Sequence, residues 1–457
     1  MATAPLSRNP VLLSVPSLPA PARLRLLRVF FGDRLTLLKR FADGGQEIVG
    51  FRFARRYVVF LNEARAVGEV LLEKEADYHK GPALSIYSRP LLGNGLLTSE
   101  EGFHRRQRRL VAPAFAHRRV VSYAAPMAEA AEQAQARWQH GQVLDIAPEM
   151  TRLTLAIVGQ TLFNAPHIED EADELGSALT AIMNYFLTIV RSPIRLPFSW
   201  IPPWEGEARA AIVRLNSTIL KLIHDRRACG RDEGDLLSML LLAQDTEDDG
   251  AGMTDTQIRD ELMTLFLAGH ETTANALIWT WYLLAKHPEI YRRLQDEVDT
   301  ALAGRTPTYA DLERMPYTLQ VLKESMRLYP PAYAIVRQAI RDTEIAGRRV
   351  PRKAIVLISP YMLHRRPDYF ADPERFDPDR WTPEADQRRP RYAYLPFGGG
   401  PRICVGAAFA QMEGHLILAA LAQRVTFSLV APDREVVPDP VITLRPQGAV
   451  SMRVTRR

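Results

Sequence analysis

Two short apolar runs, at 49–53 and 57–61, flank the polar segment Ala54-Arg55-Arg56 near the start of the chain. Apolar runs of this length around a polar turn predict a β-hairpin. Apolar residues at helical spacing begin at Phe103 and continue, with breaks, to about Lys286. More than a third of the chain is therefore expected to form consecutive helices.

The pattern changes after Pro330, where strand-like runs and turn residues dominate until a last helix at about 405–424 and a hairpin around Pro446-Gln447-Gly448. The sequence therefore predicts a mostly α protein with a small β subdomain, whose sheets lie near 49–61, 333–360 and 426–455. We find no internal repeat, low-complexity segment or Ser/Gly-rich linker. Residues 14–457 are accordingly expected to form a single large domain after a flexible leader at 1–13.

Two proline-rich segments interrupt these patterns. Residues 76–99 mix prolines and glycines with apolar side chains, which predicts a long irregular loop of the kind that is usually functional. Residues 185–204 contain four prolines among aromatic residues that include Phe186. This second segment is a candidate lid.

The composition limits the classes of protein that this chain can represent. It has 457 residues, of which 47% are hydrophobic and 24% charged, as in ordinary globular proteins. The net charge of +5 is small for this length and includes no polybasic block, so the composition argues only weakly for a nucleic-acid partner, and an acidic protein partner fits equally well. Two cysteines, Cys229 and Cys404, are too few for a disulfide scaffold or a four-thiolate metal site.

The first 32 residues carry arginines but no acidic residue, which is one mark of a transit peptide. Prolines at 16, 19 and 21 and arginines at 23, 25 and 28 interrupt the apolar run from Val11, so it is too short to span a bilayer. The same prolines disfavour a targeting helix. We therefore expect no transmembrane anchor.

One long helix is predicted to begin at Thr254, which forms a capping box with Gln257, and to end at His287 before a proline. At 1.5 Å per residue it is roughly 50 Å long. Between 262 and 285 it is apolar nearly all round, so it should be buried. Its centre nevertheless reads Ala268-Gly269-His270-Glu271-Thr272-Thr273.

A carboxylate and a glycine are both unfavourable in the middle of a buried helix. One interpretation is a core Glu271 that a salt bridge satisfies, with the threonines bonded back to the helix. The other is that Ala268-Gly269 lets a flat cofactor approach the backbone while Glu271 and a threonine handle protons. A zinc-protease HExxH motif is excluded because position 274 is alanine.

A second candidate site surrounds Cys404, in the segment Phe397-Gly-Gly-Gly-Pro-Arg-Ile-Cys-Val-Gly406. Consecutive glycines allow a tight loop, and a cysteine before a helix has its thiolate favoured by the free N–H groups and the dipole. The segment fails as a phosphate-binding loop because no Lys or Ser/Thr follows the glycines, and no local histidine signature marks a nucleophile. A third alternative is an axial thiolate for haem iron, with Arg402 available to a propionate and Phe397 near the ligand.

These residues resemble the cytochrome P450 family of haem-thiolate monooxygenases. The signature Phe-x-x-Gly-x-Arg-x-Cys-x-Gly is met from Phe397 to Gly406, and the oxygen-side motif is met at Ala268, Gly269, Glu271 and Thr272. Glu324-Ser-Met-Arg327 is similar to the Glu-x-x-Arg helix, and Pro373-Glu-Arg375-Phe376 to the segment that supplies a second arginine. The four motifs occur in the expected order.

The resemblance implies several residue roles. Cys404 would hold the iron of haem b, and Glu324, Arg327 and Arg375 would form a buried network that supports its loop. Three side chains would bind haem propionates: Arg108, Arg337 and, one helical turn before Arg108, His104. Position 104 departs from the family pattern, which usually has tryptophan there.

The resemblance also implies a reaction. Glu271 and Thr272 would relay protons while one atom of O2 is inserted into a C–H or C=C bond of a substrate. The chain shows no flavin or nicotinamide motif, so electrons are expected from a ferredoxin or similar partner with an NAD(P)H reductase. Arg105, Arg106, Arg109 and Arg402 are a candidate docking face for that acidic partner.

The substrate pocket is expected to be apolar and the substrate lipophilic. The motifs are similar to those of the branch with fatty-acid, terpenoid, carotenoid and steroid-type hydroxylases, in a bacterial and cytoplasmic protein or one touching the membrane surface. The predicted pocket residues are Phe266, Leu267, Ala268, Ala332, Ala334, Ile335 and Val336. Two rival functions are a peroxide-driven or rearranging haem-thiolate enzyme and a non-catalytic haem sensor.

Overall fold

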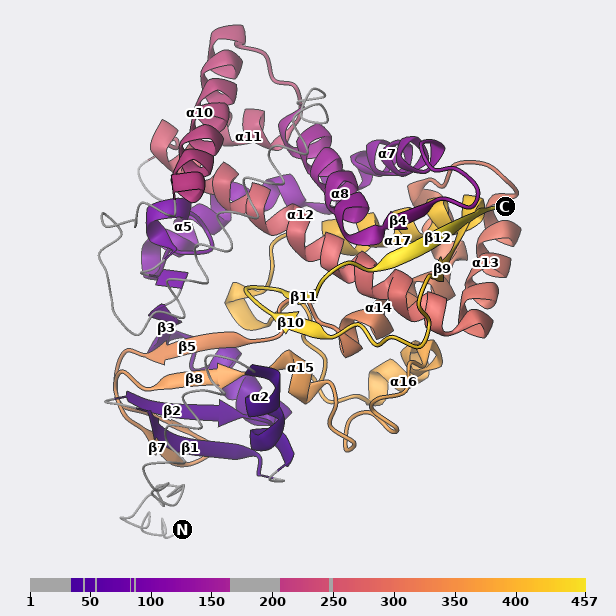
Figure 1. Cartoon of the computed structure of the whole chain (residues 1–457). Coiled ribbons are helices and arrows are strands. Elements are labelled where there is room, and N and C mark those ends of the chain that lie inside the picture. Colours follow the sequence, from indigo (N-terminus) through magenta and orange to yellow (C-terminus); the bar gives the residue numbers. More distant parts are fainter. Residues whose placement is uncertain are drawn as a thin grey trace. The chain divides into compact units, whose positions relative to one another are not determined.

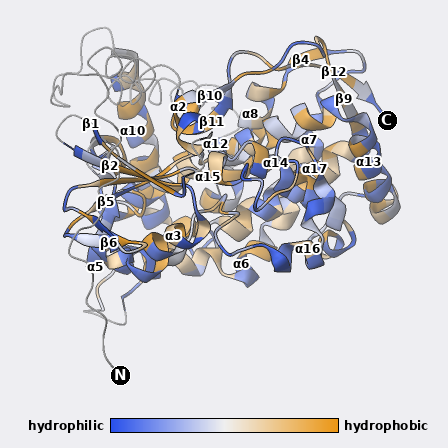
Figure 2. Ribbon diagram, turned by 90° about the horizontal axis from the view of Figure 1, so that it is seen from below, coloured by the Kyte–Doolittle hydropathy of each residue, from blue (hydrophilic) through white to orange (hydrophobic). Residues whose placement is uncertain are grey.

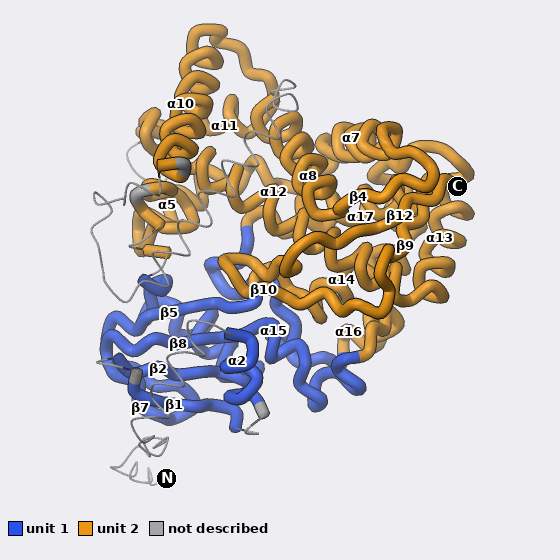
Figure 3. The backbone as a smooth tube through the Cα atoms, viewed as in Figure 1, with its two compact units in different colours: residues 1–82, 333–374, 388–404 blue, residues 83–332, 375–387, 405–457 orange. Residues whose placement is uncertain are grey.

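The computed structural model describes residues 34–43, 46–53, 56–82, 84–85, 88–164, 206–245 and 250–457. The predicted leader and the candidate lid near Phe186 lie outside these residues. The chain divides into two compact units (Figure 3). The first unit comprises residues 1–82, 333–374 and 388–404, and the second comprises residues 83–332, 375–387 and 405–457.

The first unit is built around a five-stranded sheet of order β1-β2-β8-β5-β3. Only the β2–β8 pair in it is parallel. The elements of this unit are α2 (Arg34–Asp43), β1 (Ile48–Phe53), β2 (Arg56–Leu61), α3 (Ala64–Gly68), a π-helical turn (Glu69–Glu73), β3 (Tyr78–Lys80), β5 (Ile335–Ala339), β6 (Thr343–Ile345), β7 (Arg348–Val350), β8 (Ile355–Ile358) and α15 (Pro360–Leu363). The predicted hairpin at 49–61 is confirmed as the antiparallel β1–β2 pair.

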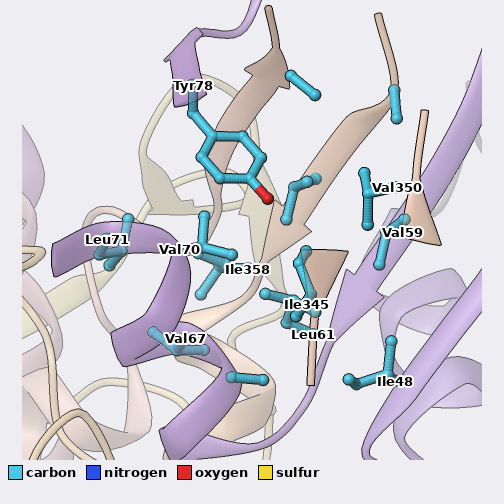
Figure 4. Close-up of a cluster of buried hydrophobic side chains, with 14 of the residues drawn as sticks. Ile48, Val59, Leu61, Val67, Val70, Leu71, Tyr78, Ile345, Val350 and Ile358 are labelled. Carbon is cyan, nitrogen blue, oxygen red and sulfur yellow. The ribbon is translucent and has the colours of Figure 1, made fainter. Parts of the chain in front are cut away.

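The core of this unit lies between the sheet and the helical segment that follows β2. Apolar side chains from β2 and β8 meet Val67, Val70 and Leu71 from α3 and the π-helical turn (Figure 4). The strands themselves are largely apolar (Figure 2). α3 begins after Glu63, whose carboxylate accepts the N–H groups of Arg65 and Ala66, each at 2.7 Å. The packing fixes the backbone of Leu71.

The second unit is mostly helical, as the sequence predicted. Its helices are α4 (Arg89–Leu92), α5 (Glu101–Val111), α6 (His117–Ser122), α7 (Ala124–Ala136), α8 (Ile146–Phe163), α10 (Gly206–Cys229), α11 (Leu236–Leu242), α12 (Asp255–Lys286), α13 (Pro288–Leu302), α14 (Pro316–Leu328), α16 (Pro383–Arg388) and α17 (Ala407–Arg424). Its strands are β4 (Val143–Asp145), β9 (Val425–Leu429), β10 (Pro438–Pro440), β11 (Leu444–Pro446) and β12 (Ser451–Arg456). Short 3-10 turns cover 112–115, 309–314 and 378–381.

The long helix predicted from Thr254 is confirmed as α12. Thr254 is its N-cap and forms the capping box with Gln257. α12 crosses this unit between α8 and α14 and also packs against α10 and α17 (Figure 1). α12 is apolar nearly all round because these helices surround it.

Two acidic residues of α12, Asp260 and Glu261, serve a tertiary role. Their carboxylates accept the backbone N–H groups of Asn94 and Leu96 at 2.7 and 2.9 Å. They therefore hold part of the irregular 76–99 loop against α12.

The C-terminal hairpin differs from its prediction. β11 pairs with β10, which precedes it, whereas β12 pairs with β9 and β4. The turn residues at 446–448 therefore connect two different sheets, because the strands on either side have partners from elsewhere in the chain.

Candidate active site

In the first unit, a glycine loop carries Cys404, whose side chain is exposed. Gly398 and Gly400 have φ of +73° and +68°, in the left-handed region that favours glycine. A Cβ at Gly400 would lie 1.8 Å from the carbonyl oxygen of Leu71. The loop closes where the Cys404 N–H donates to the Phe397 carbonyl at 3.0 Å. Backbone geometry and close contact therefore require glycine at position 400 and fix where the sulfur sits.

The start of β5 lies beside this loop. A Cβ at Gly398 would be 3.8 Å from the Cδ1 of Ile335, and Ala334, Ile335 and Val336 are all half-buried. Ala332, in the second unit, is exposed. Three of the predicted pocket residues are thus brought close to the Cys404 loop within one unit.

The two arginines predicted here for propionates have protein partners. Arg402 donates to the carboxylate of Glu75 and, at 3.4 Å, to the carbonyl of Tyr78. Arg337 is buried on β5 and donates to the Val336 carbonyl at 3.1 Å. Their contact with an anionic ligand remains a prediction.

In the second unit, α5 carries the other two predicted ligands of an anion. His104 is buried and Arg108 is half-buried, on the helix face that also buries Gln107 and Val111. Residues four apart share a helix face, so the predicted juxtaposition of 104 and 108 is present.

α12 is closed along most of its length but open at its centre. In the fully described stretch 260–284 every residue is buried except Ala268, Gly269, Glu271 and Thr272. Ala268, Glu271 and Thr272 fall on one side of the helix, and we call these three residues the open face of α12, with Gly269 at its border to α8. This otherwise buried helix is therefore accessible at the position where it carries a carboxylate and a hydroxyl, as expected for a helix that lines an active site.

Phe266 points away from this open face, contrary to its assignment to the pocket beside Ala268. It packs against Phe163 of α8 with ring centroids 5.9 Å apart and contributes to a small apolar cavity with residues of α10. Two positions along an α-helix correspond to a rotation of about 200°, which places residue 266 on the opposite side from 268. Leu267 is also buried.

Gly269 is explained by helix packing. A Cβ at this position would lie 3.1 Å from a methyl group of Val158 on α8. Next to it, the Thr154 hydroxyl of α8 donates to the His270 carbonyl at 3.0 Å. We expected Gly269 to let a flat cofactor approach the backbone. The structure shows instead that glycine at this position allows close packing against α8, because a side chain there would point at that helix.

His270 is excluded as a proton-transfer group near neutral pH. It is buried, and its Nδ1 lies 2.8 Å from the Phe266 carbonyl. Burial lowers the pKa of its imidazole to about 4, despite that hydrogen bond. The ring is therefore neutral and points into the protein interior.

Glu271 and Thr272 have side chains that can handle protons. The Thr272 hydroxyl donates to the Ala268 carbonyl at 2.8 Å. Glu271 accepts a hydrogen bond of 2.7 Å from the Thr443 hydroxyl. Burial raises the pKa of Glu271, while this hydrogen bond and the charge of Arg445 oppose the increase. Within the part of the chain that the structure describes, the Glu271 carboxylate forms no salt bridge, so the first interpretation of Glu271 is not supported.

Glu324 is the centre of a buried network in the second unit. Arg327 donates to it through Nε at 2.7 Å and Nη2 at 2.8 Å. The other donors are the Asp377 N–H at 2.9 Å, Arg380 Nε at 3.0 Å and the Trp381 indole at 2.9 Å. Five donors therefore satisfy one carboxylate that has no exposed surface.

The prediction that Arg375 is the third member of this network is wrong. Its side chain is exposed, and it contributes only its backbone carbonyl, which accepts from Arg327 at 3.0 Å. Arg380 takes the predicted place because the 3-10 turn at 378–381 directs its guanidinium and the Trp381 indole to Glu324. The sequence held this signal, since Pro-Asp-Arg380-Trp repeats the Pro-Glu-Arg375-Phe pattern five residues later.

Two further polar residues were missed. Thr443 lies in a turn-rich segment without a motif, and Glu413 lies on apolar α17. Glu413 has no exposed surface, and neither of its oxygens has a hydrogen-bond partner among the described residues. Burial raises the pKa of its carboxyl to about 8. A lone acidic residue in the apolar run 407–424 was the signal available in the sequence.

The candidate docking arginines are partly neutralised. Arg106 and Arg109 both pair with Asp245, at 3.2 and 2.9 Å. Arg105 is exposed, and Arg402 belongs to the other unit and pairs with Glu75. Two of the three candidate arginines on α5 therefore share their charge with Asp245.

Two general findings bear on ligands. Within the described residues, no group of three or more His, Cys, Asp or Glu side chains is placed to bind a metal ion. The exposed Cys404 sulfur, framed by glycines, fits instead a metal that brings its own other ligands, such as porphyrin-bound iron.

None of the helices in the described ranges is long and apolar enough to cross a membrane.

Comparison with known proteins agrees with this geometry. The family model described as Cytochrome P450 matches residues 16–451. Cyclooctatin synthase of Streptomyces melanosporofaciens is 39% identical, covering 87% of this chain and 86% of its own. Pentalenene oxygenase of Streptomyces avermitilis is 35% identical, covering 85% of each chain. A crystal structure of the cytochrome P450DA heme domain superposes with a TM-score of 0.85 at 29% identity, covering 94% and 95% of the two chains.

Proposed function

Because the chain belongs to the cytochrome P450 family of haem-thiolate monooxygenases, we propose that it hydroxylates or epoxidises a terpenoid, with Cys404 as the iron ligand. The observation that carries this proposal is the centre of α12, which is open only at Ala268, Gly269, Glu271 and Thr272. Ala268 offers an apolar surface there, next to the two groups that can transfer protons. The family's enzymes use O2 and electrons from a redox partner.

Cys404 and its surroundings fit haem. Haem bound through a thiolate supplies the chemistry that activates O2. The glycine loop fixes the backbone so that the sulfur is presented outward, and the Cys404 N–H is already engaged by Phe397. Arg108, His104, Arg337 and Arg402 are the proposed partners of the propionates.

Glu271 and Thr272 are proposed to move protons at the open face of α12. An acid works best as a proton relay when its pKa approaches the working pH, and burial shifts the pKa of Glu271 in that direction. The Thr272 hydroxyl is held by the Ala268 carbonyl and retains its lone pairs as acceptors. Exchange of a proton between solvent, Glu271 and Thr272 therefore needs no large rearrangement of α12.

A terpenoid is favoured over the other lipophilic classes by the names of the relatives. One relative is named for cyclooctatin and another for pentalenene, and each covers most of this chain. A ferredoxin with its NAD(P)H reductase is the proposed electron source. The Streptomyces relatives support a bacterial, cytoplasmic setting.

A spectral titration tests the substrate class. Purified haem-loaded protein is mixed with cyclic terpenes, fatty acids, steroids and carotenoids, and the haem spin-state shift is recorded. We expect the tightest binding among cyclic terpenes, followed by oxygenated product with NADPH and a surrogate ferredoxin system. Turnover with peroxide but not with NADPH would support the rearranging or peroxide-driven alternative, and no binding or product in any class would contradict the proposal.

A further inference from the structure

We propose that Thr443 is a positioning residue that fixes Glu271 at the open face of α12, with Asn275 setting the direction of its hydroxyl. This inference rests on the role proposed above for Glu271 in proton transfer. It assigns a function to the segment before β11, which no sequence motif marks. The steps below use only contacts within the second unit.

The direction of the hydrogen bonds follows from their donors. The Asn275 Nδ2 group donates to the Thr443 Oγ1 at 3.0 Å, and the Thr443 hydroxyl then donates to the Glu271 Oε1 at 2.7 Å. An amide NH2 group only donates, so it leaves the threonine hydrogen free for the carboxylate. The result is a one-way chain from Asn275 through Thr443 to Glu271, between two positions one helical turn apart on α12.

The backbone next to Thr443 is anchored to α12. The Trp279 indole donates to the Leu444 carbonyl at 2.9 Å, and the Leu444 N–H donates to the Pro331 carbonyl at 2.9 Å. Trp279 is fully buried and stacks on Tyr329 with ring centroids 3.9 Å apart. Thr443 cannot drift from Glu271 without breaking these contacts, which makes it a fixed anchor.

The electrostatic surroundings of Glu271 support the same role. Arg445 on β11 favours the ionised carboxylate, as does the Thr443 hydroxyl, and both oppose the effect of burial. His270 on the same helix is neutral, and burial raises the pKa of Glu413 on α17 to about 8, so that its carboxyl is protonated near neutral pH. The carboxyl that exchanges protons is therefore tuned by β11 and the residue before it.

Thr443→Val tests the link directly, because valine keeps the shape of threonine and removes its hydroxyl. The Glu271 carboxyl carbon is followed by NMR across pH in haem-loaded protein labelled with 13C-glutamate, and Glu271→Gln assigns its signal. We expect the Thr443→Val midpoint at higher pH, by about fivefold in proton concentration, which corresponds to one hydrogen bond of about 1 kcal/mol. Thr443→Ser should restore the wild-type midpoint.

Thr280→Val is the matched control. Thr280 is a buried threonine of α12 whose hydroxyl bonds back to the Ala276 carbonyl at 2.7 Å, so its loss should leave the Glu271 midpoint unchanged. An unchanged midpoint in Thr443→Val would overturn the inference. Thr443→Ala serves for the same titration if the valine variant does not fold.

A second readout separates this inference from the proposed function. The pH profile of NADPH consumption with a surrogate ferredoxin system should shift to higher pH in Thr443→Val and lose its Glu271-dependent limb in Glu271→Gln. If Glu271→Gln leaves the profile unchanged, the proton-transfer role is wrong, whatever the NMR result. If Glu271→Gln changes the profile but Thr443→Val leaves it unchanged, Thr443 does not position the relay.

Discussion

The Cys404 loop and the centre of α12 hold their reactive groups in place by opposite means. The loop uses the absence of side chains: glycines at 398–400 let the backbone pass within contact distance of Leu71. The centre of α12 uses side chains: the Thr443 hydroxyl holds Glu271, and the Thr154 hydroxyl holds the His270 carbonyl. The Cys404 loop therefore depends on positions without a side chain, and the centre of α12 depends on hydrogen-bond donors.

This difference predicts how each region fails. A loop built on close backbone contact should be damaged by adding a single carbon atom. A polar interior built on paired donors and acceptors should be damaged by removing a partner, because the remaining group stays buried and unsatisfied.

The largest effect is expected from Cys404→His. The variant should lose the absorption spectrum of the reduced carbon monoxide complex that marks thiolate-bound haem, together with all monooxygenase activity, because no other ligand occupies the loop. The matched control is Cys229→His, which changes the other cysteine, also exposed, at the end of α10. The assignment is contradicted if Cys404→His retains the thiolate spectrum.

Removal of a partner is tested by Arg380→Leu against Arg375→Leu. Arg380→Leu leaves Glu324 short of one charged donor in a site with no exposed surface, so the free energy of unfolding should fall by about 3 to 5 kcal/mol. Arg375→Leu changes an exposed side chain and should alter it by less than about 0.5 kcal/mol. Urea denaturation measures the free energy of unfolding of both variants. Equal losses would show that the Arg375 side chain contributes to the network around Glu324.

Addition of an atom is tested by Gly400→Ala. The new Cβ would overlap the Leu71 carbonyl and place alanine at positive φ, so we expect a loss of about 2 to 5 kcal/mol and weaker haem retention. Gly448→Ala isolates the effect of φ, because Gly448 has φ of +79° and open space around its Cβ position. It should lose only about 1 to 2 kcal/mol in urea denaturation. Similar losses in both variants would show that contact with Leu71 is unimportant.

A further effect, which depends on pH, is expected from Glu413→Gln. Burial raises the pKa of Glu413 to about 8 in the folded protein, from 4.5, so the folded state holds a proton that the unfolded state releases. Wild-type stability should therefore fall as pH rises from about 4.5 to about 8, with a slope of at most about 1.4 kcal/mol per pH unit from this group. Glutamine removes this contribution.

The measurement is urea denaturation of both proteins at pH 5.5 and pH 8. The stability of Glu413→Gln relative to wild type should increase between these two values. A constant difference at both pH values would mean that Glu413 is ionised in the folded state over the whole range.

The sequence predicted the elements whose signals are local. The cap at Thr254, the length of α12 and the β1–β2 hairpin follow from residues close together in the chain. The glycines before Cys404 likewise predicted a tight loop, and the structure gives a reason for Gly400 that the sequence could not, since Leu71 lies more than 300 positions away.

Several predictions needed the direction in which a side chain points, and the local sequence does not give that direction. Phe266 and Ala268 are two residues apart, yet α8 and α10 take one side of the helix and leave the other open. Arg375 and Arg380 sit in near-identical sequence patterns, and only the turn at 378–381 selects which guanidinium meets Glu324. Gly269 suggested room for a cofactor, but Val158 fills the space.

By itself, the sequence determined which residues have the chemistry of a haem-thiolate oxygenase, because thiolate, carboxylate, hydroxyl and glycine are fixed by residue type. Only the tertiary structure decided which of them are exposed, which partner each one meets and therefore which are poised to react. The physical reason is that burial and hydrogen bonding join residues such as Thr443 and Glu271 that are 172 positions apart, and these contacts shift the pKa of Glu271.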